Sequence, residues 1–242
     1  NTTMSVNQIT QIRLADGKTI SLTDWSSRRL YSTGDILNGA TDEQIRLFSY
    51  TEGDNVVSSD NLPAAARRIA TLADTNIQTA NQLASTEEFL VYAIEAEMYM
   101  RTYNSGNNSI SITIAGQPGL NHTTMKALHL QLLLELDISE KTFPISSIGR
   151  FAPGFGPVVT PAFSGNLSAL ALAESGIQSR DAVESLSIPL HIGGTEEYSV
   201  ILHNPSGQQI DTYANTGIAD TDETRVLTTR VSLCGLHKRP TA

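Results

Sequence analysis

The segment Thr224–Leu236 reads Thr-Arg-Val-Leu-Thr-Thr-Arg-Val-Ser-Leu-Cys-Gly-Leu, and it decides the fold class of the chain. Apolar or β-branched residues occupy every second position, at Leu227, Thr229, Val231 and Leu233. Successive side chains of a β-strand point to opposite faces, so a period of two is typical of a strand with one buried face. We therefore predict a long final strand.

A second apolar segment, Phe89–Arg101, is compatible with two structures. Ser85–Glu88 has the pattern of a capping box, and good helix formers follow it, which would suit an α-helix. Against this, every even-numbered residue from Leu90 to Met100 is apolar or aromatic, as one face of a strand would be. We favour the strand on this alternation; a helix here would weaken an all-β interpretation.

Shorter patterns predict the remaining strands. Turn residues inside apolar, β-branched segments indicate hairpins in Ile9–Leu22, around Ile45–Val57 and in Ser187–His203. Ser109–Ala115 alternates isoleucine with polar residues and should pair with the strand at 89–100. Leu128–Leu136 has leucine at every second position, which predicts one buried and one wetter face.

Other segments lack strand patterns. Ser32–Thr41 is interpreted as a loop, and Phe143–Phe163, which is rich in proline and glycine, should cross the surface without regular structure. Leu62–Ala73 and Asn166–Gly176 have the spacing and end residues of short helices. Pro189 must lie at a sheet edge or strand entrance, because proline cannot donate to a β-ladder.

Together these elements predict a mainly β protein, a Greek-key β-sandwich or barrel with one or two short helices and long loops. We expect one domain over residues 1–242, with residues 1–40 as a candidate N-terminal arm or hairpin extension. Charged residues form 17% of the chain, below the roughly 25% of ordinary soluble domains. The formal net charge of −9 argues against a broad nucleic-acid-binding face, which would need clustered lysine and arginine.

Motifs for chemistry are absent from the sequence. It has no phosphate-binding glycine loop, no nucleophile elbow and no metal-ligand spacing among its five histidines, which are His122, His129, His191, His203 and His237. His191 and His203 could face each other across the predicted hairpin, which makes them the best metal candidates. Ordinary strand histidines are the stronger interpretation.

Paired carboxylates are the other candidates for catalysis. Glu95 and Glu97 would project from the same face of a strand, and paired carboxylates can act as acid and base in glycosidases, but such pairs are more often solvated or salt-bridged. Glu196 and Glu197 lie in a predicted turn and are interpreted as surface charge, with calcium binding as a weaker hypothesis.

Four other features have simple structural interpretations. The basic clusters Arg67-Arg68 and His237–Arg239 are interpreted as solvated, although either could contact an acidic neighbour or a genome. Cys234 is the only cysteine, so we expect a buried apolar residue in a strand and no intrachain disulfide. Trp25 should pack in the core, with a subunit contact as the alternative. We predict no catalytic, cofactor-binding or metal site, and no enzyme activity.

The C-terminal quarter resembles the closing strands of jelly-roll capsid proteins of tailless icosahedral viruses and phages, including those with an internal membrane. The resemblance rests on Ile188–Pro205, a strand, a Gly-Gly turn and a strand, and on the ending Leu233–Pro240. The resemblance implies a jelly-roll fold and a shell-forming subunit, and it assigns no catalytic residue to this chain.

The expected function is therefore a self-assembling structural subunit of a viral capsid, assembled in the host cytoplasm and located in the virion. Its expected partners are copies of itself, with other coat proteins and an underlying membrane as further candidates; direct nucleic-acid binding is not expected. The alternative is a carbohydrate- or receptor-binding β-sandwich, which would need an exposed aromatic platform. A third class, a jelly-roll enzyme, would need a convergent carboxylate pair or histidine cluster.

Overall fold

A computed structural model of the chain has a mainly β architecture, as the sequence predicts. It describes residues 11–13, 19–21, 24–37, 44–59, 62–104, 109–112, 130–151, 158–161, 171–174, 185–205 and 223–238. Within these residues lie one larger sheet, one smaller sheet and two separate strand pairs.

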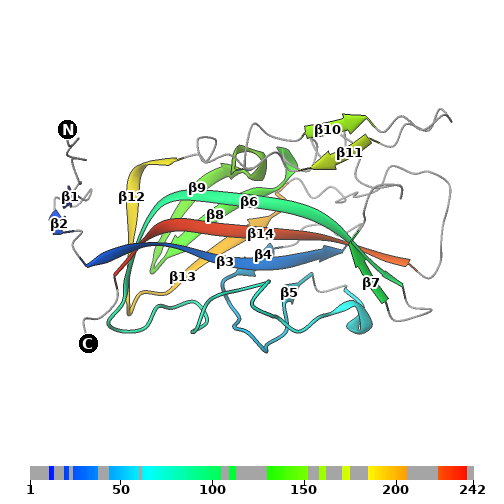
Figure 1. Ribbon diagram of the computed structural model, residues 1–242, viewed down its shortest axis with the longest axis horizontal. Helices are drawn as coiled ribbons and strands as arrows, with labels where there is room; N and C mark the ends of the chain where they lie inside the picture. Colours follow the sequence, from blue (N-terminus) through cyan, green and yellow to red (C-terminus); the bar gives the residue numbers. More distant parts are fainter. Residues whose placement is uncertain are drawn as a thin grey trace, which may run out of the picture.

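The larger sheet is built around the predicted final strand. Its order is β12-β6-β14-β3-β5, and β7 pairs with β6 beyond the end of β12. Figure 1 shows β6, β14 and β3 side by side along the long axis of the molecule. The strand bounds are β3 Trp25–Leu37, β5 Val57–Ser58, β6 Glu88–Asn104, β7 Ser109–Ile112, β12 Ser185–Gly193 and β14 Glu223–Lys238.

The smaller sheet has the order β4-β13-β8-β9, with all pairs antiparallel. Its strands are β4 Gln44–Leu47, β8 Leu133–Ile138, β9 Lys141–Ser147 and β13 Tyr198–His203. The separate pairs are β1 Gln11–Arg13 with β2 Thr19–Ser21, and β10 Val158–Pro161 with β11 Ala171–Glu174. Two 3-10 turns, η1 Ala64–Ala66 and η2 Ile148–Phe151, complete the described elements.

One hydrophobic core lies between the two sheets. It joins alternate side chains of β14 to those of β8 and β13, including Leu227 and Val231 on one side and Leu134 and Val200 on the other. Each sheet turns its apolar face inward because that removes the apolar surface of both from water at once. Two facing sheets, neither of them closed, are consistent with a β-sandwich.

The strand predicted at Phe89–Arg101 is confirmed as β6, but its alternation is interrupted at Tyr92. The register with β14 slips there, since Cys234 pairs with Ala93 and Gly235 with Val91. Tyr92 is consequently a bulged residue and 39% exposed. Core-facing positions are even-numbered after the bulge and odd-numbered before it, so the single apolar face predicted from Leu90 onward is wrong in its first part.

Several predicted pairings are confirmed. The hairpin between β1 and β2 lies within 9–22, β7 pairs with β6, and the final strand is β14. Of the leucine row, Leu132, Leu134 and Leu136 are buried, whereas Leu130 is 67% exposed and Leu128 lies outside the described residues. Pro189 lies in an edge strand, as predicted, at a break in the pairing of β12 with β6.

Two predicted hairpins are wrong, because neighbours in sequence pair with distant strands. The segment Ser187–His203 contains β12 and β13, but these belong to different sheets. The turn between them crosses from one sheet to the other. It packs closely on the chain before β6, because a Cβ atom on Gly194 would lie 2.4 Å from the Ala84 carbonyl oxygen. Likewise, β4 pairs with β13 while β5 pairs with β3, so the pair expected around Ile45–Val57 does not form.

The predicted loops and helices are also corrected. Residues 32–37 of the expected loop Ser32–Thr41 lie in β3. Within Phe143–Phe163 the chain forms most of β9, then η2 and β10; β9 is an edge strand, and Pro144 sits just past a register shift, where proline is tolerated.

Neither predicted helix forms as expected. Within Leu62–Ala73 the helical part is only the turn η1, because Leu62 and Ala66 pack on Val226 while Ala70 packs separately with Tyr50 and Val56. In the expected helix Asn166–Gly176, residues 171–174 form strand β11. Residues 25–37 of the candidate N-terminal arm form β3, inside the larger sheet.

We predict that Gly235→Ala destabilises the protein. A Cβ atom at this position would lie 2.4 Å from the Leu90 carbonyl oxygen and 2.5 Å from the Phe89 ring, so the backbone at the bulge would have to shift. Such overpacking costs about 1–3 kcal/mol of unfolding free energy. Urea unfolding measures this loss of stability. Gly193→Ala is the control, because the atom nearest to a Cβ atom added there is a side-chain oxygen of Glu196 at 3.4 Å. Equal stabilities of the two variants would contradict this account of the bulge.

Candidate functional site

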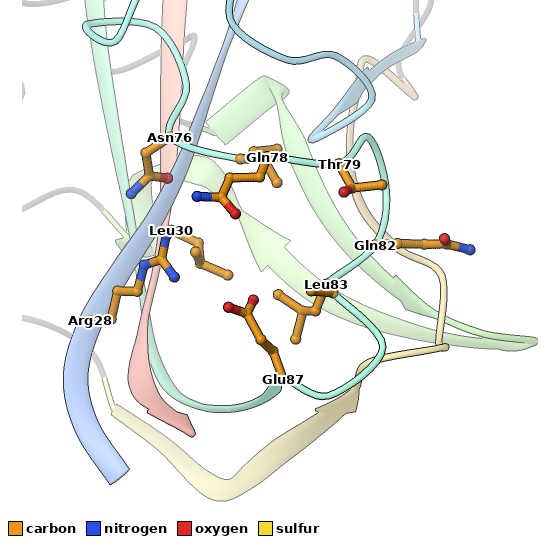
Figure 2. A pocket seen from close by; sticks show the side chains of 10 residues that line it. Arg28, Leu30, Asn76, Gln78, Thr79, Gln82, Leu83 and Glu87 are labelled. Carbon is orange, nitrogen blue, oxygen red and sulfur yellow. The ribbon is translucent and has the colours of Figure 1, made fainter. Parts of the chain in front are cut away.

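A small hollow lies at one end of the larger sheet, beside the start of β6. Arg28 of β3 and Glu87, just before β6, point toward it, while Leu30, Ile77 and Leu83 supply apolar walls (Figure 2). Its internal volume is about 10 Å³. A site for a small molecule usually spans about 300–1,000 Å³, and a single water needs roughly 10–15 Å³. The hollow can therefore hold about one water and no substrate.

His237 lies beside this hollow with no exposed surface. Its Nε2 atom is 3.2 Å from a Glu87 carboxylate oxygen, and its Nδ1 atom is 3.3 Å from Nη1 of Arg28. The Phe89 ring lies 6.3 Å from the imidazole, centre to centre. These contacts tie the ends of β3, β6 and β14 together, so His237 is a structural residue and not part of a solvated basic cluster.

The neighbouring residues form a second ion cluster. The Glu88 carboxylate accepts hydrogen bonds from Lys238 and from Nε2 of His191, both at 2.8 Å. The Lys238 hydrogen bond is the main reason that the pKa of Glu88 is lowered. Lys238 is thus paired within the chain, and Arg239 lies outside the described residues.

A buried charge network joins the larger sheet to the chain segment between β4 and β6. Asp35 of β3 is 1% exposed. Its carboxylate forms salt bridges with Arg101 of β6 at 2.5 Å and with Arg68 of the connecting segment at 3.1 Å. Thr228 of β14 donates to the same carboxylate at 2.8 Å. Arg68 also pairs with Asp74, so two carboxylates balance two guanidinium groups. Four distant parts of the chain meet at this network.

We predict that Asp35→Asn destabilises the protein strongly. The amide keeps the shape of the carboxylate but leaves Arg68 and Arg101 without their shared counter-charge, and breaking a buried ion pair costs roughly 3–5 kcal/mol. Denaturant unfolding would measure the loss. The control is Arg46→Gln, which removes a 3.8 Å ion pair with Asp137 from an arginine whose side chain is 57% exposed, and should change stability by about 1 kcal/mol or less. Similar small effects of both changes would contradict the network's role.

The same network predicts sensitivity to acid. Burial would raise the pKa of Asp74, but hydrogen bonds from Arg68 and from the Thr71 amide outweigh burial and hold the pKa below its usual value of about 3.9. A carboxyl with a lowered folded pKa stabilises above its unfolded pKa, and this contribution is lost as pH falls through the folded pKa. The stability difference between the native chain and Asp74→Asn should therefore be constant above about pH 5 and shrink below about pH 4. A difference that stays constant down to about pH 3 would contradict this assignment.

The proposed histidine pair is wrong. His191 lies in β12 of the larger sheet and His203 in β13 of the smaller sheet, so they do not face each other across a hairpin. His203 instead lies 3.2 Å from Glu135. His122 and His129 fall outside the described residues. Among the described side chains, no three His, Cys, Asp or Glu residues group as a metal site would require.

The carboxylate candidates have structural partners. Glu95 is buried and forms a 2.9 Å salt bridge with Arg29. For Glu95, therefore, the salt-bridged interpretation applies. Glu97 is partly buried on the same face, and it too has a partner. Glu196 accepts a hydrogen bond from the Gly193 amide at 2.7 Å and so closes the turn between β12 and β13, while Glu197 is exposed.

The remaining candidates divide between buried and exposed positions. Cys234 is buried in β14, as predicted, and burial raises the pKa of its thiol to about 11. The Arg68 side chain is only 15% exposed and is paired in the network, so its interpretation as solvated is wrong, whereas Arg67 is exposed. Trp25 is half-buried at the start of β3.

Sequence reasoning missed two exposed aliphatic residues. Ile69 and Leu72 lie within the predicted helix Leu62–Ala73, and they are 57% and 62% exposed. It also missed the Asp35–Arg101 pair, because the two residues are 66 positions apart. Asp35 also lies in the segment Ser32–Thr41 that the sequence predicts as a loop, so no strand pattern marked its carboxylate as buried.

No helix in the described part of the chain is both long and apolar enough to cross a membrane. Comparisons of the chain with protein-family models, curated proteins and solved structures find no match.

Proposed function

We propose that the chain is a structural subunit of a viral capsid and that its two sheets form a jelly roll. The observation that carries the proposal is the nested pairing of its eight main strands, which follow one another as β3, β4, β6, β8, β9, β12, β13 and β14. The first pairs with the eighth, the second with the seventh, the third with the sixth and the fourth with the fifth, all antiparallel. A long antiparallel hairpin rolled up on itself produces this order, which supports a jelly roll of two four-stranded sheets.

A jelly roll alone does not specify a function, since capsid subunits, lectins and cupins all use it. The capsid is favoured by the resemblance of Ile188–Pro205 and Leu233–Pro240 to closing strands of coat proteins. The low content of charged residues suits surfaces that pack against copies of the same chain, and the net charge of −9 suits a layer that does not bind the genome directly.

In this proposal the activity is assembly itself. Each copy buries apolar and polar surface against its neighbours, and a stable contact of this kind covers about 1,200–2,000 Å² in total. Repeated contacts with closed symmetry produce a shell in the virion. The partners are copies of the chain, with other coat proteins or an underlying membrane as additional neighbours, and no catalytic residue is assigned.

A carbohydrate- or receptor-binding sandwich remains the second candidate because of one observation. Tyr92 and Ile188 are both exposed, at 39% and 55%, and both lie where β6 and β12 break register. An exposed tyrosine offers an apolar face with a polar tip, as binding sites for sugars use.

We expect the purified full chain to form large discrete assemblies. Light scattering coupled to size-exclusion chromatography, over a range of salt and pH, should detect them, and negative-stain electron microscopy should image capsomers or shells in the large fraction. The contacts are predicted to be mainly uncharged, so assembly should persist as salt increases.

A strictly monodisperse monomer under every condition would contradict the capsid proposal. If that monomer also binds immobilised glycans, and Tyr92→Ala abolishes the binding, the second candidate replaces the first.

A further inference from the structure

The segment between β4 and β6 covers part of the larger sheet and is held to it by side-chain contacts. We call residues 50–59 and 62–75 the covering segment; it includes β5, and in Figure 1 it runs in blue to cyan beside β3. Ile36 of β3 faces the core, so its neighbour Asp35 points to the opposite face, toward this segment. Arg68 of the covering segment reaches that carboxylate. The segment is therefore fixed to the face that points away from the smaller sheet.

Further bonds hold the covering segment in place. The Tyr50 hydroxyl donates to the Thr33 carbonyl at 2.6 Å, and the Thr33 hydroxyl donates to the Asp74 carbonyl at 2.9 Å. Inside the segment, residues 53–56 run antiparallel to residues 68–70, with Asn55 opposite Ile69. Tyr50, Val56 and Ala70 bury their side chains beneath this small ladder.

The outer side of the ladder carries an apolar ridge formed by Ile69 and Leu72, which are 57% and 62% exposed. The carbonyl of Leu72 accepts a hydrogen bond from the Tyr31 hydroxyl, so the backbone beneath the ridge is held. An anchored apolar ridge loses little conformational entropy when it is covered, and this favours a protein contact there.

Charges at the two ends of the ridge are opposite in sign. The ladder bonds place Gly53 beside Ala70 and Val56 beside Arg68, so Arg67 and the turn residues Glu52 and Asp54 lie at opposite ends. All three are exposed. When a surface with a positive and a negative end meets its own copy about a two-fold axis perpendicular to the line between those ends, each end faces the opposite charge of the other copy.

We propose that a second copy of the chain docks on this ridge about a two-fold axis. Ile69 of each copy packs near Ile69 of the other, and Arg67 of each faces Glu52 of the other. This inference rests on the proposed function, because it identifies one of the contacts by which copies assemble. The occupant is a copy of this chain because the ridge, with its two charged ends, is complementary to itself.

A symmetric disulfide tests the axis directly. Residues near a two-fold axis lie close to their own copies, so Ile69→Cys should form a covalent dimer under mild oxidation, seen on a non-reducing gel. The native Cys234 is buried and gives little background. Ile188→Cys is the matched control, since Ile188 is equally exposed, at 55%, but lies on β12.

Charge exchange tests the pairing without removing apolar surface. Sedimentation velocity over a concentration series should show self-association at least tenfold weaker for Arg67→Glu and for Glu52→Arg, and restored association for the double variant. Thermal unfolding of each monomer checks that the fold is intact, because Arg67→Glu also removes the 3.2 Å hydrogen bond from Arg67 Nε to the Leu62 carbonyl, whereas Glu52 is exposed.

Three results are informative. Cross-linking of Ile69→Cys but not of Ile188→Cys, with rescue by the double exchange, supports the ridge contact. If the native chain associates but Ile69→Cys does not cross-link and the exchanges have no effect, the ridge contact is wrong while the capsid proposal stands. If the native chain does not associate at any concentration, both are overturned.

Discussion

The structure depends on the pairing of β14 with β3 on one side and β6 on the other. All 16 residues of β14 pair with β6, and all 13 residues of β3 pair with β14. One face of β14 supplies Leu227, Val231 and Leu233 to the core between the sheets, and the other supplies Thr228 to the buried charge network. Since β3 and β14 are about 200 residues apart in sequence, the larger sheet forms only when distant parts of the chain meet, which predicts slow folding relative to helical proteins.

The buried Asp35 carboxylate explains how a segment without regular structure becomes a firm surface. Loops usually lie on the surface and move more than strands. Here Arg68 connects the covering segment to Asp35, and Arg101 connects the same carboxylate to β6. Such a network adds little net stability compared with apolar packing, but it penalises other placements of the segment, because those would leave a buried charge unpaired. The orientation of the Ile69–Leu72 ridge follows from this constraint.

The sequence was sufficient to predict which segments are strands wherever alternation is long, as in β14 and β6. It was insufficient for partners, because alternation specifies the buried face of a strand and not its neighbour. Adjacent strands joined by a short turn usually pair, which favoured a hairpin at Ser187–His203, yet the Gly-Gly turn there changes sheets. The bulge at Tyr92 and the Asp35 network depend on contacts between distant residues, so no local pattern could reveal them.

In the proposed function, copies of this sandwich associate into a closed shell. Edge strands of sheets can also associate into open filaments, so the form of the assembly distinguishes a designed contact from simple edge pairing. Electron cryo-microscopy of the assembled native chain tests this most directly. We expect closed particles of icosahedral symmetry in which each copy retains the two-sheet core. Open filaments, amorphous aggregates or particles without repeated subunit contacts would contradict it.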